Sequence, residues 1–279
     1  MSAKIIDGKA VAQSIKDDLK VKISALDFKI SLAVIKVGND PASEVYVRNK
    51  IKACEYIGIN SINVNLAETV SQNELETEVQ KLVDDDNIDG ILVQLPLPKG
   101  LNEEKIISMI PPTKDVDGFS DENMGKMMAG KPCAVACTPK GVLRLIESTG
   151  VDFNGKNAVV VGRSNNVGKP IALLLLNKNC TVTTCHSKTK NIEEYTKNAD
   201  ILVVAVGKPK FVTKNMVKKD AIVIDVGINR TEHGLVGDTD FDNLSDVASF
   251  ITPVPGGVGP MTVAMLMQNT YELSLRRRK

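Results

Sequence analysis

Tyr46 and Lys50 stand four residues apart in a segment with the periodicity of a helix. Side chains at this spacing project from one helix face, so the phenol and the ammonium group could meet at one substrate. A pair of this kind can transfer protons to or from a reacting group. Tyr-x-x-x-Lys is also frequent on solvated helices, so the pair alone does not establish catalysis.

Three further segments are difficult to explain by packing alone. Residues 93–98, Val-Gln-Leu-Pro-Leu-Pro, end a predicted strand with an amide side chain and two prolines, which favours a rigid extended rim. Residues 115–118, Asp-Val-Asp-Gly, place two carboxylates at a turn, where an Asx turn and a metal site are the alternatives. Residues 253–260 form a glycine-rich loop before a helix, without the Gly-Lys-Ser/Thr ending of a phosphate-binding loop. We expect the flat backbone of this loop to lie against a flat ligand.

Residues 162–168, Gly-Arg-Ser-Asn-Asn-Val-Gly, directly follow a predicted strand and open a helix. Helix-terminal N–H groups hold a pyrophosphate in this context, although Ser164 replaces the middle glycine of the usual pattern. An ordinary β–α turn is the alternative. The next strand ends in Cys185-His186-Ser187-Lys188, with no acid to bind a free ribose hydroxyl. Arg163 and Ser187 could instead contact a ribose phosphate, so the sequence favours NADP over NAD.

Short β-branched apolar runs alternate with segments of helical periodicity, which predicts an α/β fold with a mainly parallel sheet. Helices are predicted over residues 11–26, from Pro41 to Gly58, from Ser71, where Glu74 completes a capping box, and from Thr138 to Gly150. Strands are predicted over residues 31–37, 90–94, 157–162, 180–186, 200–206 and 221–226. The last four strands indicate half or more of a dinucleotide-binding fold. The 279 residues fit two domains, with a boundary expected near Thr138.

The motifs Tyr46-x-x-x-Lys50, VQLPLP, KDVDG, CTPKG, VVVGRSxxVGKP, TVTTCHSKT and ITPVPGGVGPMT occur in this order along the chain. The set resembles the FolD-type methylenetetrahydrofolate dehydrogenase/cyclohydrolases over essentially the whole chain, and the longest motifs exclude chance agreement. The resemblance implies two α/β domains flanking a cleft. These are a folate-binding catalytic domain of residues 1–139 and a Rossmann-like NADP-binding domain of residues 140–260, with the C-terminal helix 261–279 packed back onto the first. It also implies a homodimer.

The resemblance further implies NADP-dependent oxidation of 5,10-methylenetetrahydrofolate and hydrolysis of the 5,10-methenyl product to 10-formyltetrahydrofolate. Lys50 would move protons in the hydrolysis, Tyr46 would orient it and Gln94 would hydrogen-bond it, while Asp117 would bind the pterin. The residues implied to line the folate site are Tyr46, Val93, Gln94, Leu95, Asp117, Pro255, Gly256, Gly257 and Gly259. Those implied to bind NADP are Gly162, Arg163, Ser164, Val167, Gly168, Ser187 and Ile228.

Two positions depart from the pattern of the family. Ala136 stands where proline is common, which could loosen the interdomain connection. Thr239 stands where valine is common and is nearly isosteric with it, so we expect little consequence.

Two other classes of protein share some of these features. Short-chain dehydrogenases also use Tyr-x-x-x-Lys, but their nucleotide loop comes first in the chain, whereas Gly162 here lies far beyond Lys50. A non-catalytic NADP-binding sensor is the other alternative, because fold alone does not establish activity. The retention of Lys50, Gln94 and Asp117 disfavours it.

Composition limits the partners. The 35 basic and 34 acidic residues give a net charge of +1, which provides no long-range attraction to nucleic acid or to an anionic membrane. No apolar run approaches the roughly 20 residues of a membrane span, and the N-terminus lacks the apolar segment of a secretion signal, so a cytoplasmic protein is expected. The five cysteines lack paired spacing, and His186 and His233 are the only histidines, so no metal site is expected. The basic end, residues 276–279, is expected to be a solvated helix end.

Overall fold

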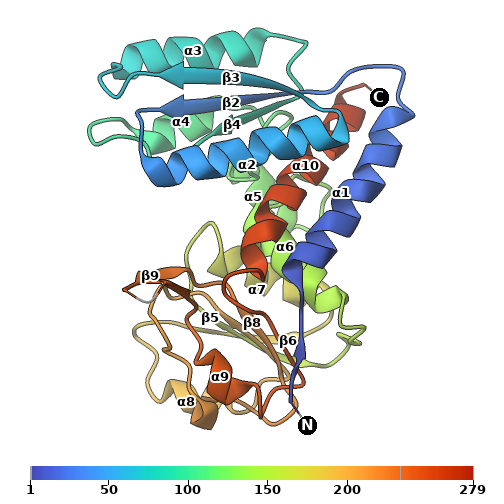
Figure 1. Cartoon of the computed structure of the whole chain (residues 1–279), viewed down its shortest axis with the longest axis vertical. Helices are drawn as coiled ribbons and strands as arrows, with labels where there is room; N and C mark the ends of the chain where they lie inside the picture. The colour runs from blue at the N-terminus through green and yellow to red at the C-terminus, as the bar shows by residue number, and fades with distance from the viewer. Residues whose placement is uncertain (1, 233, 279) are drawn as a thin grey trace. The chain divides into compact units, whose positions relative to one another are not determined.

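The computed structural model describes residues 2–232 and 234–278, without the side chains of residues 41–43. His233 and Lys279, considered above, therefore lie outside the described residues. The chain forms two compact units (Figure 1), one of Gln13–Cys137 with Val263–Lys279, the other of Met1–Ala12 with Thr138–Thr262. Three helices each contribute to both units: α1 (Gly8–Ser24), α6 (Cys137–Glu147) and α10 (Val258–Arg277).

The unit of Gln13–Cys137 with Val263–Lys279 contains a parallel three-stranded sheet in the order β3 (Asn60–Leu66), β2 (Ser31–Val37), β4 (Gly90–Val93). Alternate residues of β2 point to opposite faces, and Ala33 and Ile35 pack in one cluster with Leu75 and Ile106. Helices α3 (Gln72–Asp84) and α4 (Glu103–Met109) therefore cover that face, and Figure 1 draws α2 (Pro41–Ile57) on the side of the sheet opposite α3. Helix α5 (Asp121–Met128) completes the unit.

Helix α3 is stabilised at both ends by side chains. The predicted capping box is confirmed, because the Glu74 carboxylate accepts the Ser71 N–H at 2.9 Å and the Ser71 hydroxyl accepts the Glu74 N–H at 3.3 Å. At the other end, the buried ammonium group of Lys114 donates to the carbonyl oxygens of Val83 and Asp85, both at 2.7 Å. Burial lowers the pKa of Lys114, and three carbonyl acceptors, including Leu82 at 3.3 Å, compensate for its lost hydration.

The basic C-terminus of α10 is not simply a solvated helix end, so that expectation was wrong for Arg277 and Arg278. Arg278 pairs with the buried carboxylate of Asp89, and its guanidinium lies 4.1 Å from the ring centre of Phe28. Arg277 donates to the carbonyl oxygen of Ile88. Asp89 just precedes β4, so these contacts fasten the end of α10 to the three-stranded sheet.

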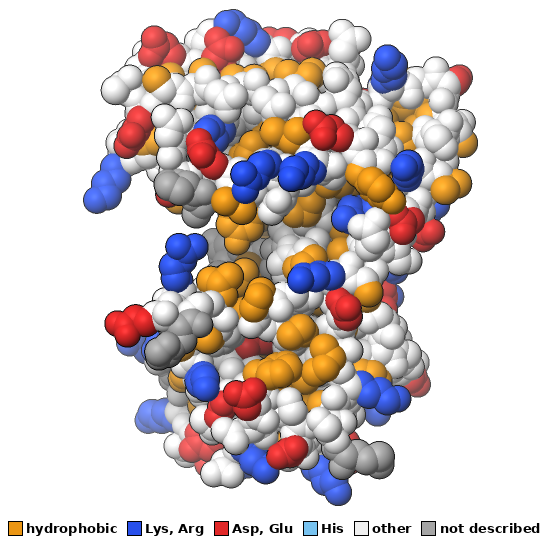
Figure 2. Space-filling view, viewed as in Figure 1, with side chains coloured by type: hydrophobic (Ala, Val, Ile, Leu, Met, Phe, Trp, Pro, Cys, Tyr) orange, Lys and Arg blue, Asp and Glu red, His pale blue; other side chains and the backbone are white. Residues whose placement is uncertain are grey.

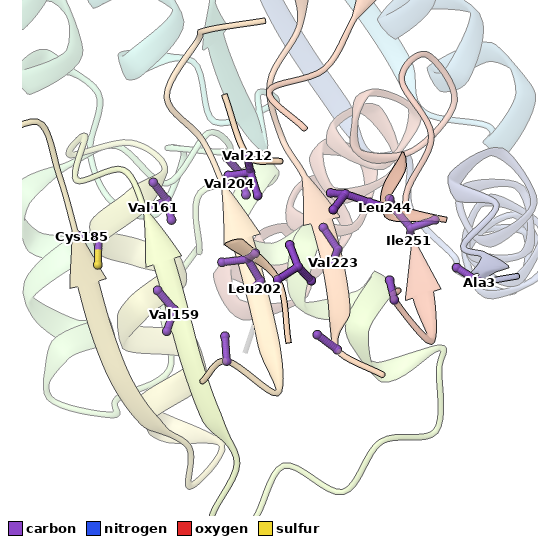
Figure 3. Packing of buried hydrophobic residues seen from close by; sticks show 14 residues of the cluster. Ala3, Val159, Val161, Cys185, Leu202, Val204, Val212, Val223, Leu244 and Ile251 are labelled. Atoms are coloured by element: carbon purple, nitrogen blue, oxygen red, sulfur yellow. The ribbon is translucent and has the colours of Figure 1, made fainter. Parts of the chain in front are cut away.

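The other unit contains a parallel six-stranded sheet. Its order is β1 (Lys4–Ile5), β11 (Phe250–Ile251), β8 (Ile222–Asp225), β7 (Ile201–Val204), β5 (Asn157–Val161), β6 (Thr181–Cys185). The first residues of the chain thus pair with this sheet, whereas the sequence placed them in the first domain. Valine and leucine side chains from β5, β7 and β8 form its core (Figure 3). The remaining elements are α7 (Gly168–Asn177), α8 (Ile192–Thr196), a 3-10 turn (Lys214–Met216), the hairpin β9 (Asn229–Thr231) and β10 (Gly234–Val236), and α9 (Phe241–Leu244).

Acidic and basic side chains are interspersed over the face drawn in Figure 2, in agreement with the net charge of +1. Among the described residues, no helix is both long enough and apolar enough to cross a membrane.

Candidate active site

Lys50 is held in place by the motif that ends β4. Its side chain projects from α2, is only 9% exposed, and donates from Nζ to Oε1 of Gln94 at 2.9 Å. Gln94 in turn donates from Nε2 to the carbonyl oxygen of Leu95 at 2.7 Å, which turns its amide oxygen toward the lysine. Val93, the last residue of β4, directly precedes Gln94 and is buried. The predicted link between Lys50 and Gln94 is therefore present.

Tyr46 lies one turn before Lys50 on α2 and is 46% exposed. The buried lysine and the exposed phenol thus stand in succession on one helix face. This arrangement leaves the Tyr46 ring accessible to a bound molecule.

The two carboxylates of the Asp-Val-Asp-Gly turn have different roles. Asp115 is buried and accepts hydrogen bonds from the N–H groups of Gly118 and Ser120, both at 2.8 Å, and from Nδ2 of Asn123 at 3.0 Å. It therefore makes the Asx-type turn that was one of the two alternatives. Among the described residues, no group of three or more His, Cys, Asp or Glu side chains could hold a metal ion.

The side chain of Asp117 takes no part in this turn, and the backbone of Asp117 is fixed from both sides. The carbonyl oxygen of the preceding Val116 accepts hydrogen bonds from Nδ2 of Asn269 at 2.8 Å and from Sγ of Cys137 at 3.4 Å. Gly118 follows with a φ of +71°, packed so closely that an added Cβ would lie 2.6 Å from the Ala136 nitrogen. Asn269 was missed from the sequence, where the only indication was a pair of amides, Gln268 and Asn269, in an apolar stretch of α10.

The surroundings of Asp117 perturb its ionisation. Burial raises the pKa of its carboxyl to about 6, the nearby positive charge of Lys50 acts against this rise, and Asp115 adds to it. Lys50, Gln94 and Asp117 therefore form one electrostatically coupled site within one unit.

This raised pKa predicts a stability cost. A carboxyl with a pKa of about 6 in the folded state and near 3.8 in the unfolded state binds more protons when folded, so stability falls as pH rises from about 4 to 6. Replacing Asp117 with Asn removes this loss, and we expect the ligand-free variant to be more stable than the parent by up to about 3 kcal/mol above pH 6. Urea unfolding at pH 4 and pH 7.5 measures the difference, which should nearly vanish at pH 4. A variant less stable than the parent at pH 7.5 would contradict this view of the site.

The other unit carries the nucleotide loop. A Cβ on Gly162 would lie 2.3 Å from the Ala205 carbonyl oxygen, and one on Gly168 would lie 2.2 Å from the Gly162 carbonyl oxygen, so both positions require glycine. Ser164, at the place of the missing glycine, accepts the Gly168 N–H on its hydroxyl at 3.3 Å and braces the loop where α7 begins. Such a backbone cradle ahead of a helix fits a pyrophosphate.

The remaining predicted nucleotide residues lie around the carboxyl ends of the same strands. Arg163 and Ser187 are exposed after β5 and β6, Val167 is half-buried just before α7, and Ile228 is 49% exposed after β8. Carboxyl ends of parallel strands are where such folds bind ligands.

The glycine-rich loop of residues 253–260 belongs to this unit and not to that of Lys50. The reason for a glycine differs from one position of this loop to the next. Gly256, after the exposed Pro255, has a φ of +109°, while a Cβ on Gly257 would lie 2.6 Å from the Pro253 carbonyl oxygen. Gly259 alone of the three has open space where a Cβ would lie. No packing contact within the described residues therefore requires a glycine at position 259.

One unit has a parallel sheet with a glycine cradle, and the other holds a buried lysine and a perturbed carboxyl. Both are features of the class of α/β dehydrogenases. Two family models match the chain. The tetrahydrofolate dehydrogenase/cyclohydrolase catalytic domain matches residues 6–117, and the NAD(P)-binding domain of the same family matches residues 136–278. The chain belongs to the tetrahydrofolate dehydrogenase/cyclohydrolase family.

Individual relatives agree. The chain is 55% identical to the bifunctional protein FolD of Agathobacter rectalis, over 98% of this chain and 100% of that one. Its structure is similar to that of the bifunctional FolD enzyme of Campylobacter jejuni, with a TM-score of 0.96 and 47% identity over 99% and 100% of the two chains. A Trypanosoma brucei FolD structure gives a TM-score of 0.94 at 37% identity, over 100% and 99%.

The chain is therefore a bifunctional enzyme. It oxidises 5,10-methylenetetrahydrofolate with a nicotinamide dinucleotide and hydrolyses the 5,10-methenyl product to 10-formyltetrahydrofolate. Membership of this family excludes both the short-chain dehydrogenase and the non-catalytic sensor.

Proposed function

We propose that Lys50 moves the protons of the hydrolytic reaction, that Gln94 and Tyr46 orient it, and that Asp117 binds the pterin. The observation that supports this assignment best is the 2.9 Å hydrogen bond that the largely buried Lys50 donates to Gln94. The charge of Lys50 also acts on the pKa of Asp117. The folate chemistry is assigned to the domain predicted over residues 1–139, apart from the first residues, which pair with the six-stranded sheet, and nucleotide binding is assigned to residues 140–260.

The two reactions make different demands on these residues. NADP, when bound, accepts the hydride that leaves the methylene bridge, and the protein must position the two reactants. In the hydrolysis, a water oxygen bonds to the methenyl carbon and loses its protons. One of them goes to the ring nitrogen released when the C–N bond breaks, and the other goes to solvent. Lys50 would carry these protons, because its side chain can take a proton as the neutral amine and give one as the ammonium ion.

The pterin presents a ring N–H and an amino group side by side. An ionised Asp117 can accept both as parallel charge-assisted hydrogen bonds. The residues proposed to line the remainder of the folate site are Val93, Leu95, Pro255, Gly256, Gly257 and Gly259. A partly desolvated carboxylate is well suited to this task, because ligand donors replace the water that it has lost.

We assign NADP as the nucleotide. The tip of β6 carries no acid, Arg163 and Ser187 are exposed beside the glycine cradle, and the Trypanosoma brucei relative is described in complex with NADP. Assaying the pure protein with methylenetetrahydrofolate and either nucleotide, with reduced cofactor and methenylfolate followed separately, tests the proposal. A kcat/KM with NAD equal to or above that with NADP would overturn it.

A carboxylate placed beside the ribose phosphate should weaken NADP selectively. We expect Ser187→Asp to lower kcat/KM for NADP by about tenfold or more, since like charges in contact cost several kcal/mol, and to change the value for NAD little. Thr181→Asp is the matched control, because Thr181 is exposed at the opposite end of the same strand. An equal fall with both nucleotides would argue against a phosphate contact at Ser187.

We propose that the protein is a homodimer, as the family resemblance implies, and that it is cytoplasmic, as the sequence predicts. Sedimentation of the pure protein, whose chain mass is 30.1 kDa, distinguishes a dimer from a monomer.

A further inference from the structure

Two buried aspartates of the six-stranded unit have no part in the functions assigned so far. Asp225 is the last residue of β8, and Asp238 follows the hairpin of β9 and β10. They are 2% and 0% exposed. A buried carboxylate is costly unless it is fully hydrogen-bonded, so the donors around each one identify what it holds.

The Asp238 carboxylate accepts hydrogen bonds from two separate segments, residues 206–208 and Asn229. Its Oδ2 accepts the N–H groups of Val206 and Gly207 at 2.6 and 2.9 Å, and its Oδ1 accepts that of Lys208 at 2.9 Å. Three consecutive N–H groups thus form a nest around one carboxylate. Its Oδ1 also accepts Nδ2 of Asn229 at 2.8 Å. Asp238 therefore ties the loop after β7 to the segment after β8.

The same carboxylate explains a glycine next to a predicted nucleotide residue. A Cβ on Gly227 would lie 2.1 Å from the Asp238 side chain, so only glycine fits there. Gly227 and Asn229 flank Ile228, which is proposed to bind the nucleotide. Both neighbours of Ile228 thus contact the Asp238 side chain, Gly227 by close packing and Asn229 by a hydrogen bond.

Asp225 fixes Asp238 in turn. Its carboxylate accepts the N–H groups of Asp238 and Thr239 at 2.9 and 2.8 Å, and the Thr239 hydroxyl at 2.7 Å. Its own N–H donates to the hydroxyl of Thr252 at 2.7 Å. The position of Asp238 is therefore set from the buried end of β8.

Strand order locates these segments relative to a ligand. Strand β5 leads to β6 on one side of it, whereas its other neighbour, β7, leads to β8 in the opposite direction. The sheet therefore has its switch point between β5 and β7. Ligands of open α/β sheets bind at such a point, beyond the carboxyl ends of the strands. The loop of residues 206–208 follows β7 there. Its predecessor Ala205 lies against Gly162 of the nucleotide loop, 2.3 Å from where a Cβ would be.

We propose that Asp238 is a positioning residue for the dinucleotide, and that it acts by fixing residues 206–208 and Ile228 at the switch point. The N–H groups of residues 206–208 are engaged by Asp238, so this loop does not serve as a phosphate site. It offers carbonyl oxygens instead, which suit the donors at the nicotinamide end of the cofactor, its carboxamide and ribose hydroxyls. Phosphate binding is thereby left to residues 162–168. The inference rests on the proposed nucleotide site.

The test compares two aspartates on the same sheet. Asp238→Asn places an amide donor against the N–H groups of the nest, and we expect the Kd and the KM for NADP to rise on the order of tenfold or more. Methenyl hydrolysis, which consumes no nucleotide, and the KM for folate should stay within about twofold. Asp200→Asn is the control, because Asp200 precedes β7 at the amino end of the sheet and likewise accepts a backbone N–H, from Asn157 at 2.9 Å. It should leave the Kd for NADP unchanged.

The possible outcomes distinguish the positioning role of Asp238 from the nucleotide site itself. A folded Asp238→Asn protein with parental NADP affinity, or one in which hydrolysis falls in parallel with NADP binding, overturns the positioning role. Failure of the parent protein to bind NADP would instead remove the proposed nucleotide site itself. Where Asp238→Asn does not fold, Asn229→Ala decides, because it removes one donor and leaves the nest intact. A rise of a few fold in the Kd for NADP supports the inference, and no rise contradicts it.

Discussion

Replacing Lys50 with Met should reduce methenyl hydrolysis by about 10²–10⁴-fold, the usual contribution of a positioned proton-transfer group. Methionine fills a similar volume, but it leaves Oε1 of Gln94 without the donor that it has at 2.9 Å and provides no group that can carry a proton. Hydride transfer requires no proton acceptor, so dehydrogenase activity should fall much less. Measuring the two activities on one preparation gives the ratio directly.

Two matched variants separate proton transfer from charge and from helix stability. Lys52→Met makes the same change at an exposed position of α2 and should leave both activities unchanged. Lys50→Arg keeps the positive charge near Asp117 but cannot release a proton at neutral pH, so hydrolysis should remain lost. Recovery of hydrolysis in Lys50→Arg would mean that the residue acts through its charge alone, and unchanged turnover in Lys50→Met would remove it from the mechanism.

The long helices and strands could be predicted because the residues within each segment carry its pattern of apolar positions or its capping residues. Strand β2 occupies the predicted residues 31–37, since a run of β-branched and aliphatic residues is buried on both faces. Strand β3 was missed although residues 62–66 alternate apolar and polar side chains, which is the pattern of a half-buried strand at a sheet edge. Strands β1 and β11 are two residues each and are made by segments far apart in the chain, so no local pattern could reveal their pairing.

The candidate site shows the same division between local pattern and tertiary contact. The motif around Lys50 and Gln94 could be found by resemblance, which also singled out Asp117 in the 115–118 turn. The residues alone could not show that the other carboxylate, Asp115, is structural. That distinction required the donors that surround Asp115. The expectation that Thr239 differs little from valine was incomplete, because its hydroxyl donates to buried Asp225 at 2.7 Å. A hydroxyl in a buried network is not equivalent to a methyl group.

Replacing Asp117 with Asn should raise the Kd for the folate substrate by about a hundredfold or more. The pterin offers two donors, each hydrogen bond to a carboxylate contributes about 1.5–3 kcal/mol, and an Asn side chain turns one acceptor into a donor that faces them. Asp121→Asn is the matched control, because Asp121 is exposed in the first turn of α5 and should not affect folate binding. Calorimetric titration with substrate measures the Kd, and parental affinity in Asp117→Asn would require another pterin anchor.

The pH dependence of folate binding tests the same carboxylate without removing it. With its pKa raised to about 6, Asp117 is mostly ionised at pH 7.5 and mostly protonated at pH 5. Only the ionised form accepts both pterin donors, so the Kd of the parent protein should rise as pH falls through about 6. The Asn variant has no group to titrate at this position, and its weaker Kd should remain level over the same range. Below pH 6, where Asp117 is protonated, the parent protein should bind folate more weakly. Under the same conditions its ligand-free form no longer bears the stability cost of the charged Asp117 carboxylate, which the Asn variant lacks at every pH. The ionised Asp117 carboxylate lowers the stability of the free protein, and the hydrogen bonds from the pterin compensate for this loss. One residue therefore accounts for the pH dependence of both folate affinity and stability.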